Sequence, residues 1–183
     1  GDKNLRYQLN LQYDTNNGVM KGSGRDKYSI GSVLDYNLGD NFRVRNELMV
    51  SELTEKNSPY GSFSTYARQN PYERIYDENG DMVKTFTSTN EINPMINSTL
   101  PNRDRTKSTI WKDNFSLEWR FLNAFRLTSR ISYTKTLAED ETFLSPNSPT
   151  FQNETDVAKK GKATYFDSRE TSVDGNIMLS FYK

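Results

Sequence analysis

Apolar and polar residues alternate one for one along six segments of the chain. The first segment has apolar side chains at every second position: Leu5, Tyr7, Leu9, Leu11 and Tyr13. The same alternation returns near residues 28–38, 42–50, 111–121, 125–137 and 173–181. A repeat of two residues is that of a β-strand with one apolar and one polar face, whereas a helix would spread these side chains around its axis. The pattern therefore predicts six amphipathic strands.

These segments are longer than ordinary strands. A typical strand has about 5–6 residues, whereas these run for about 9–11, which is the length that a tilted strand needs to cross a bilayer. Three polar residues interrupt the apolar rows: Ser32, Asn46 and Asp113. The opposite face is rich in charge, with Arg43, Arg45, Glu47, Glu118, Arg120, Arg126 and Arg130 among its members. Both a large solvated interior and the outer face of a soluble sheet would accept such residues.

Short and long connections alternate along the chain. Gly39-Asp40-Asn41 and Leu122-Asn123-Ala124 each predict a tight hairpin turn, because they contain turn-forming residues. The other connections are long, at about residues 14–27, 53–109 and 139–170. Short turns on one rim and long loops on the other are typical of outer-membrane barrels, whose long loops lie outside the cell.

Aromatic residues gather near the predicted strand ends. Those expected near the short turns are Tyr36, Phe42, Trp119, Phe121 and Phe125. Those expected near the opposite ends are Tyr13, Tyr28 and Trp111. Aromatic side chains are enriched where a barrel meets the two membrane–water interfaces. We therefore interpret these eight residues as candidates for membrane-interface contacts with lipid.

The predicted fold class is all-β: an antiparallel transmembrane β-barrel segment spanning residues 1–183, with short periplasmic turns and long extracellular loops. Single-chain bacterial barrels begin at about eight strands, and an open edge in lipid leaves backbone groups that each cost several kcal/mol. Six strands therefore predict a piece of a larger or multichain barrel. The alternative is a soluble β-sandwich, such as a carbohydrate-binding module, whose two sheets would show the same alternation.

Composition removes several functional classes. Only 33% of residues are hydrophobic while 13% are aromatic, and disordered chains are poor in aromatic residues. The 24 basic and 24 acidic residues cancel, which argues against a strongly basic nucleic-acid surface. Cysteine and histidine are absent, so disulfides, thiolate or imidazole metal ligands and the commonest catalytic bases are excluded. We expect no catalytic residue, no metal site and no cofactor.

One long loop carries a family resemblance. Residues 58–80 read SPYGSFSTYARQNPYERIYDENG, and Asn93-Pro94 follows. This segment is similar to one found in the SusC/RagA family of TonB-dependent outer-membrane transporters of Bacteroidetes. Residues 36–42 and the Phe143-Leu144-Ser145-Pro146 segment also resemble that family.

The resemblance implies functional expectations for the whole protein. It implies a 22-stranded barrel closed by an N-terminal plug domain, which this chain does not contain. It also implies a SusD-like surface lipoprotein as a lid and energy supplied by the TonB complex. The cargo would be an oligosaccharide or an oligopeptide, imported across the bacterial outer membrane.

The same loop contains candidate contacts for cargo or for the lid. A short helix is expected over residues 60–68, preceded by Ser58-Pro59 and stopped by Asn70-Pro71. The candidates are Tyr60, Tyr66, Arg68, Tyr72 and Tyr76. Tyrosine rings can stack on a sugar, and the arginine can bind a carboxylate or a lid residue. The competing interpretation is that these side chains pack the loop onto itself and the barrel rim.

Three weaker motifs have simpler explanations. The run from Asp77 to Asp81 lacks the glutamate that a calcium loop needs at its twelfth position, so Asn79-Gly80 predicts a hairpin turn. Glu139-Asp140-Glu141 is expected to form a solvated rim, because a glycosidase needs two carboxylates on opposite sides of a cleft. The basic run at residues 159–162 is expected in a solvated loop.

Overall fold

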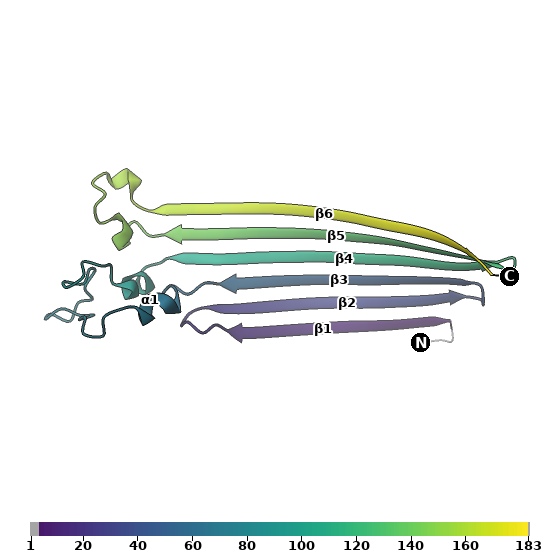
Figure 1. Cartoon of the computed structure of the whole chain (residues 1–183), viewed down its shortest axis with the longest axis horizontal. Helices are drawn as coiled ribbons and strands as arrows, with labels where there is room; N and C mark the ends of the chain where they lie inside the picture. Colours follow the sequence, from purple (N-terminus) through teal and green to yellow (C-terminus); the bar gives the residue numbers. More distant parts are fainter. Residues whose placement is uncertain (1–3, 183) are drawn as a thin grey trace.

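The computed structural model describes residues 4–182, which form one open antiparallel sheet of six strands (Figure 1). The strands are β1 (Leu5–Asn17), β2 (Gly24–Leu38), β3 (Phe42–Lys56), β4 (Arg103–Phe121), β5 (Phe125–Leu144) and β6 (Lys162–Phe181). Each strand pairs with the next in chain order, so β1 and β6 are the two edges. The prediction of an all-β chain with six antiparallel strands is confirmed.

Helical segments are short and lie in the connections between strands. They are α1 (Phe63–Ala67), η1 (Pro94–Thr99), η2 (Pro149–Phe151) and η3 (Val157–Lys159). Among residues 4–182, no helix has both the length and the apolar character needed to cross a membrane.

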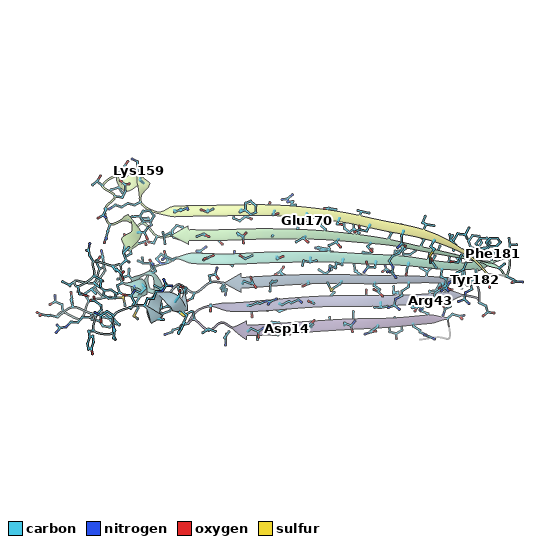
Figure 2. The ribbon with its side chains drawn as sticks, in the orientation of Figure 1. Asp14, Arg43, Lys159, Glu170, Phe181 and Tyr182 are labelled. Atoms are coloured by element: carbon cyan, nitrogen blue, oxygen red, sulfur yellow. The ribbon has the colours of Figure 1, made fainter. Side chains whose placement is uncertain are left out.

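The two ends of the sheet differ in character. We call the end with the two hairpin turns the turn end and the opposite end the loop end. Figure 2 places Lys159 at the loop end and Arg43, Phe181 and Tyr182 at the turn end. The β2–β3 turn is made possible by Gly39, whose φ of 65° lies in the region that favours glycine. Leu38 pairs with Phe42, and Phe121 pairs with Phe125, so both predicted tight hairpins are confirmed.

The strand register separates the sheet into an apolar face and a polar face. The apolar face carries rows such as Leu11–Ile30–Val50–Trp111, which run from strand to strand through paired positions. The polar face carries rows such as Arg6–Asp35–Arg45–Ser116. Side chains alternate between faces along a strand, so the register gathers the period-two pattern of the sequence into two continuous surfaces.

Nothing among residues 4–182 covers the apolar face. Leu11 on β1 is 70% exposed and Ile177 on β6 is 77% exposed. The buried apolar side chains, Phe86 and Ile96, belong to the long connection after β3 and not to the sheet. A soluble domain places a second layer over such a face. Residues 4–182 therefore do not form the two packed sheets of a sandwich.

The strands are longer than the sequence pattern predicts. The expected 9–11 residues become 13 in β1, 15 in β2 and β3, 19 in β4 and 20 in β5 and β6. The expected loops at about 14–27, 53–109 and 139–170 are wrong at their boundaries and shrink to residues 18–23, 57–102 and 145–161. Each strand continues toward the loop end past the last residue of its hydrophobic alternation.

Ion pairs on the apolar side of the sheet explain these extensions. Lys107 Nζ lies 3.1 Å from Glu52 Oε2, and Arg105 Nη2 lies 3.0 Å from Glu141 Oε2. Charged cross-strand pairs stabilise a ladder as apolar pairs do, but they do not contribute to a hydrophobic alternation. We call this charged part of the apolar side, above the level of Trp111, the charged extension.

The extensions also change where three of the predicted interface aromatics lie. Trp111 stands eight residues from the start of β4 at Arg103, and not near the strand end as expected. Tyr28 stands four residues from the start of β2, and Tyr13 four residues from the end of β1. The rings of Tyr13 and Tyr28 stack at a centroid distance of 4.7 Å. These residues lie at the boundary between the apolar face and the charged extension.

The other five aromatics lie at the turn end as expected. Phe42 pairs with Trp119, and the rings of Trp119 and Phe121 are 4.7 Å apart between centroids. The ring of Phe125 lies 5.5 Å from that of Phe121 and 5.1 Å from that of Phe181. Tyr36 pairs with Val44 two residues before the end of β2. A chain of touching rings therefore borders the apolar face at the turn end.

Candidate functional site

A groove of about 1050 Å³ crosses the polar face between β3 and β6. Its charged lining residues are Arg43, Arg45, Glu47, Glu118 and Arg130. Hydroxyl and amide side chains of the polar face complete the lining: Asn114, Ser116, Thr128, Ser132 and Asn176. The groove thus combines fixed charges with many neutral hydrogen-bonding groups.

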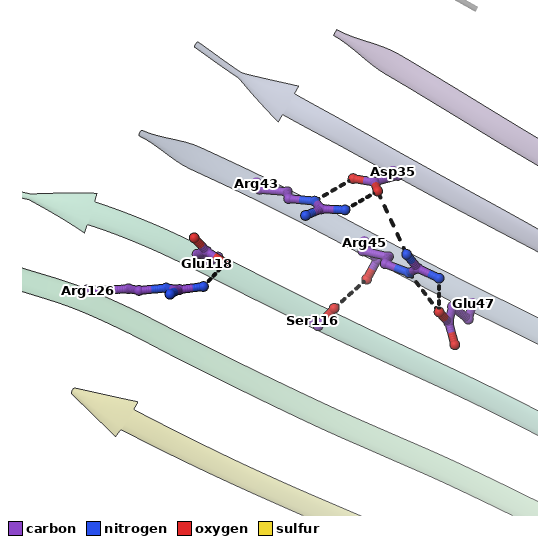
Figure 3. Close-up of polar contacts among 7 residues, drawn as sticks. All are labelled: Asp35, Arg43, Arg45, Glu47, Ser116, Glu118 and Arg126. Carbon is purple, nitrogen blue, oxygen red and sulfur yellow. Dashed lines mark hydrogen bonds and ion pairs between the residues drawn. The ribbon is translucent and has the colours of Figure 1, made fainter. Parts of the chain in front are cut away.

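Asp35 connects β2 to β3 at one side of this groove (Figure 3). Its side chain accepts hydrogen bonds from both Nε and Nη2 of Arg43, the first at 2.8 Å. A second guanidinium, that of Arg45, approaches the same carboxylate at 3.9 Å. Asp35 is only 7% exposed, and two arginines compensate its negative charge.

Arg45 continues the network across β3 and toward β4. Its Nη2 lies 2.5 Å from Glu47 Oε1, and its backbone oxygen accepts a hydrogen bond from Ser116 Oγ at 3.4 Å. On the next strand pair, Glu118 binds Arg126 at 2.7 Å and Arg120 at 2.9 Å. Figure 3 draws two groups of these contacts, one around Asp35, Arg43 and Arg45 and the other between Glu118 and Arg126. Together the ion pairs form a ladder of charges across β2, β3, β4 and β5.

The hairpin turns place these residues together. Asp35 and Arg45 are each five residues from Asp40, at the centre of the β2–β3 turn, so they pair directly. Ser116 and Arg130 are each seven residues from Asn123 in the β4–β5 turn, and they also pair. Counting outward from each predicted turn would have found these pairs. The alternation in the sequence places Arg43, Arg45 and Glu47 on the polar face, but Asp35 and its pairing were not predicted.

The carboxylates of the ladder are engaged by arginines. Asp35, Glu47 and Glu118 each accept from at least one guanidinium. Among residues 4–182, no group of three or more acidic side chains is placed to hold a metal ion. The geometry suits the binding of polar or charged groups.

A second cavity, of about 730 Å³, lies among the connections at the loop end. Tyr60 lines it, and the Lys21 ammonium lies 5.8 Å from the centroid of that ring, a cation–π contact. Ser58 Oγ donates to the Lys21 backbone oxygen at 2.7 Å, which ties the β1–β2 connection to the long loop. The helix predicted over residues 60–68 is shorter in the structure, where α1 covers only Phe63–Ala67.

The other loop candidates lie in different environments. Tyr66 is partly buried, and its hydroxyl has no hydrogen-bond partner within residues 4–182. Burial and the nearby Tyr60 raise the pKa of Tyr66 above its ordinary value. Arg68 is exposed at the end of α1, Tyr76 is 52% exposed and Tyr72 is 90% exposed. The structure therefore places Tyr72 in the open, free of packing against the loop.

Buried amides hold the two long connections in shape. Asn93 is fully buried, donates to the Val83 oxygen at 2.9 Å and accepts from the Met95 N–H at 3.0 Å. Asn102 Oδ1 accepts from the Ser145 N–H at 2.8 Å, which joins residues 57–102 to residues 145–161. These contacts were not predicted, because single asparagines in a loop give no periodic signal.

The predicted hairpin at Asn79-Gly80 is confirmed. Tyr76 and Met82 form an antiparallel bridge, and Gly80 has a φ of 87°. Asp77 Oδ1 accepts from the backbone N–H groups of Asn79 and Asp81, each at 2.9 Å. This is a local turn in which the aspartate satisfies the backbone.

Comparison of the chain with models of known protein families, and with curated protein sequences, finds no match in either.

Proposed function

We propose that this chain is part of the wall of a β-barrel in a bacterial outer membrane, and that the barrel is a SusC-like TonB-dependent importer. The observation that carries the proposal is the uncovered apolar face. It extends across all six strands, with polar residues at Ser32, Asn46 and Asp113, and its central apolar residues, such as Leu34 and Phe115, remain exposed. Lipid is the partner that covers such a face in a barrel.

The height of the apolar face fits a membrane. Between the turn-end aromatics and the level of Tyr13 and Tyr28, each strand contributes about 9–11 residues of about 3.3 Å rise. For strands tilted by about 45°, this corresponds to roughly 21–26 Å across the membrane, close to the apolar band of about 25 Å in outer-membrane barrels. Aromatic rings border the band on both sides, as membrane interfaces favour.

The loop end is the side that we assign to the cell exterior. The charged extension lies directly beyond the apolar band, and the connections at residues 18–23, 57–102 and 145–161 follow it. Hairpin turns of three residues occupy the other end. Outer-membrane barrels have short turns on the periplasmic side and longer loops outside.

The edges of the sheet support a larger assembly. β1 and β6 each have one neighbour within residues 4–182, so one edge of each strand carries free backbone groups. In lipid these groups need partners, and further strands of the barrel supply them. The resemblance of residues 58–80 to the SusC/RagA family supports a 22-stranded barrel, with a plug domain and the TonB complex acting through parts outside this chain.

In this proposal the loops meet the cargo and the lid. The candidates are Tyr60, Tyr66, Arg68, Tyr72 and Tyr76, with an oligosaccharide or oligopeptide as cargo and a SusD-like lipoprotein as lid. The arginine ladder would form part of the inner wall of the barrel, where a polar surface faces a solvated interior.

Membrane fractionation of the native full-length protein tests the proposal. We expect it in the outer-membrane fraction, released only by detergent. Recovery in the soluble fraction without detergent would contradict the barrel and favour the rival function, a soluble carbohydrate-binding module. That rival would need another polypeptide to cover the apolar face.

A further inference from the structure

Arg130 is the unmatched arginine of the groove. Four other arginines on the polar side of β3, β4 and β5 are held by carboxylates: Arg43, Arg45, Arg120 and Arg126. Within the part of the chain that the structure describes, Arg130 makes no ion pair, although it lines the same groove. A guanidinium always carries its charge and presents a fork of five N–H donors, so Arg130 has binding capacity that its surroundings do not use.

Neither carboxylate in the neighbouring rows of the polar face pairs with Arg130. Glu118, one pair closer to the turn end, is bound by Arg120 and Arg126 through separate oxygens. Asp174, on the neighbouring strand β6, accepts from Ser172 Oγ at 3.0 Å. Among the described residues, no carboxylate oxygen lies within 4 Å of a guanidinium nitrogen of Arg130, so no ion pair of the sheet neutralises its charge.

Neutral hydrogen-bonding groups surround this guanidinium. The register places Ser116 directly opposite Arg130 on one side and Asn176 on the other. The next pair toward the loop end is Asn114 with Ser132. All four residues line the groove. Hydroxyl and amide groups beside an arginine can hold an anion without adding charge of their own.

The charge balance of the groove selects the ligand class. Among its charged lining residues, Arg43, Arg45, Glu47 and Glu118 are engaged in ion pairs, and Arg130 is the one without an ion pair among the described residues. One charge matches a carboxylate better than a phosphate group, which carries more charge at neutral pH. Arginine also binds carboxylates through two parallel hydrogen bonds.

We propose that the groove binds a carboxylate group of the imported cargo, with Arg130 as the charged anchor and Ser116 and Asn176 as neutral partners. The inference rests on the proposed function and names the substrate class, an acidic oligomer such as a uronic-acid oligosaccharide. The groove, at about 1050 Å³, is large enough to hold more than a single charged group. A carboxylate from another part of the same protein is the competing source.

The test uses the full-length protein in detergent and two probes with the same sugar backbone. One is an oligogalacturonide, and the other is its methyl ester, which lacks the negative charge. For the unaltered protein we expect the acid to bind about tenfold more tightly or better, as one charged hydrogen-bonded pair provides. Arg130→Gln should equalise the two affinities, and Arg130→Lys should restore part of the preference. Arg169→Gln, which removes an exposed arginine of β6 that does not line the groove, should retain it.

Three outcomes overturn the proposal. Equal affinity of the unaltered protein for both probes would show that no carboxylate is recognised. A preference that survives Arg130→Gln would place the recognition elsewhere. If Arg130→Gln lowers the unfolding temperature of the barrel and leaves the preference unchanged, Arg130 pairs with a carboxylate of the protein itself. Membrane fractionation tests the location of the protein without reference to Arg130. A failure of the proposed barrel function can therefore be distinguished from a failure of carboxylate recognition.

Discussion

Asn46 Nδ2 donates a hydrogen bond of 2.5 Å to Asp113 Oδ1 across β3 and β4, in the middle of the apolar face. Both residues interrupt the hydrophobic alternation of their strands, and they are 67 positions apart in the sequence. Their neighbours on this face include Leu48 and Phe115, which pair with Asp113 and Asn46 respectively. A polar group in an apolar environment is costly when it has no hydrogen-bond partner. The hydrogen bond between Asn46 and Asp113 therefore offsets the cost of placing both side chains on the apolar face.

A double-mutant cycle tests this relationship. Asp113→Leu alone should lower the free energy of unfolding by about 1–3 kcal/mol, because it leaves the Asn46 amide without its acceptor. Asn46→Leu should have a similar effect, and the double variant should be less destabilised than the sum of the two. Urea unfolding of the full-length protein in lipid vesicles measures all four states. Strictly additive effects would show that the two side chains do not interact.

The sequence predicts the sheet well because one physical rule governs most of it. Alternation identifies each of the six strands, and the turn residues at Gly39 and Asn123 identify the two hairpins. The rule stops at the level of Trp111, where charged pairs such as Lys107–Glu52 replace apolar ones. The extra length of the strands escaped prediction because an ion pair between strands leaves no hydrophobic period in either strand.

The candidate site was harder to foresee for a related reason. Charges on the polar face are visible in the sequence, but the partner of each charge depends on the register. Asp35 meets Arg43 and Arg45 only because the β2–β3 turn is centred on Asp40. In the long loop no register exists, so contacts such as Asn102 with Ser145 could not be derived from spacing.

The orientation of the sheet can be tested by cysteine labelling, because the chain contains no cysteine. Leu117 and Ser116 are neighbours on β4 that belong to opposite faces. In membranes, Leu117→Cys should be protected from a water-soluble maleimide, whereas Ser116→Cys should react once the barrel interior is accessible. Equal labelling of the two variants would contradict a lipid-covered apolar face.

A second pair of cysteine variants tests which end lies outside. Val157→Cys is at the loop end, in an exposed connection, and Asn123→Cys is in the β4–β5 turn. In intact cells we expect an impermeant maleimide to label Val157→Cys and to leave Asn123→Cys unlabelled until the outer membrane is permeabilised. The reverse result would invert the assignment of the two ends.

Tyr66 provides a prediction for pH. Burial disfavours the phenolate, so the pKa of Tyr66 is raised in the folded loop relative to the unfolded chain. A raised pKa means that the folded state favours the protonated phenol. The stability of the folded loop is therefore unaffected by Tyr66 ionisation below about pH 10, and it falls as the pH rises through the pKa of Tyr66 in the folded state. Proteolysis within residues 57–102 should therefore accelerate at alkaline pH.

Tyr66→Phe separates this effect from general alkaline damage. The variant removes the ionisable hydroxyl, which has no partner among residues 4–182, and keeps the ring. We expect its proteolysis to depend less on pH, with loop stability at neutral pH unchanged or slightly higher, since an unsatisfied buried polar group is removed. Tyr76→Phe, at a half-exposed position, is the matched control and should behave like the unaltered protein. Identical pH profiles for all three proteins would exclude Tyr66 as the source.

Tyr72 gives the clearest test of cargo binding by the loop. Because its side chain is 90% exposed, Tyr72→Ala should leave the fold unchanged, and a loss of affinity can be assigned to a lost contact. A ring stacked on cargo is worth about 1 kcal/mol or more, so the dissociation constant should rise about fivefold or more. Phe63→Ala, which removes another exposed aromatic ring of the same loop, is the control and should bind normally. Isothermal titration with the native cargo measures the difference in affinity. Unchanged affinity in Tyr72→Ala would reject stacking of cargo on this ring. Tyr60, which lines the loop-end cavity, would then be the remaining aromatic candidate with a defined site.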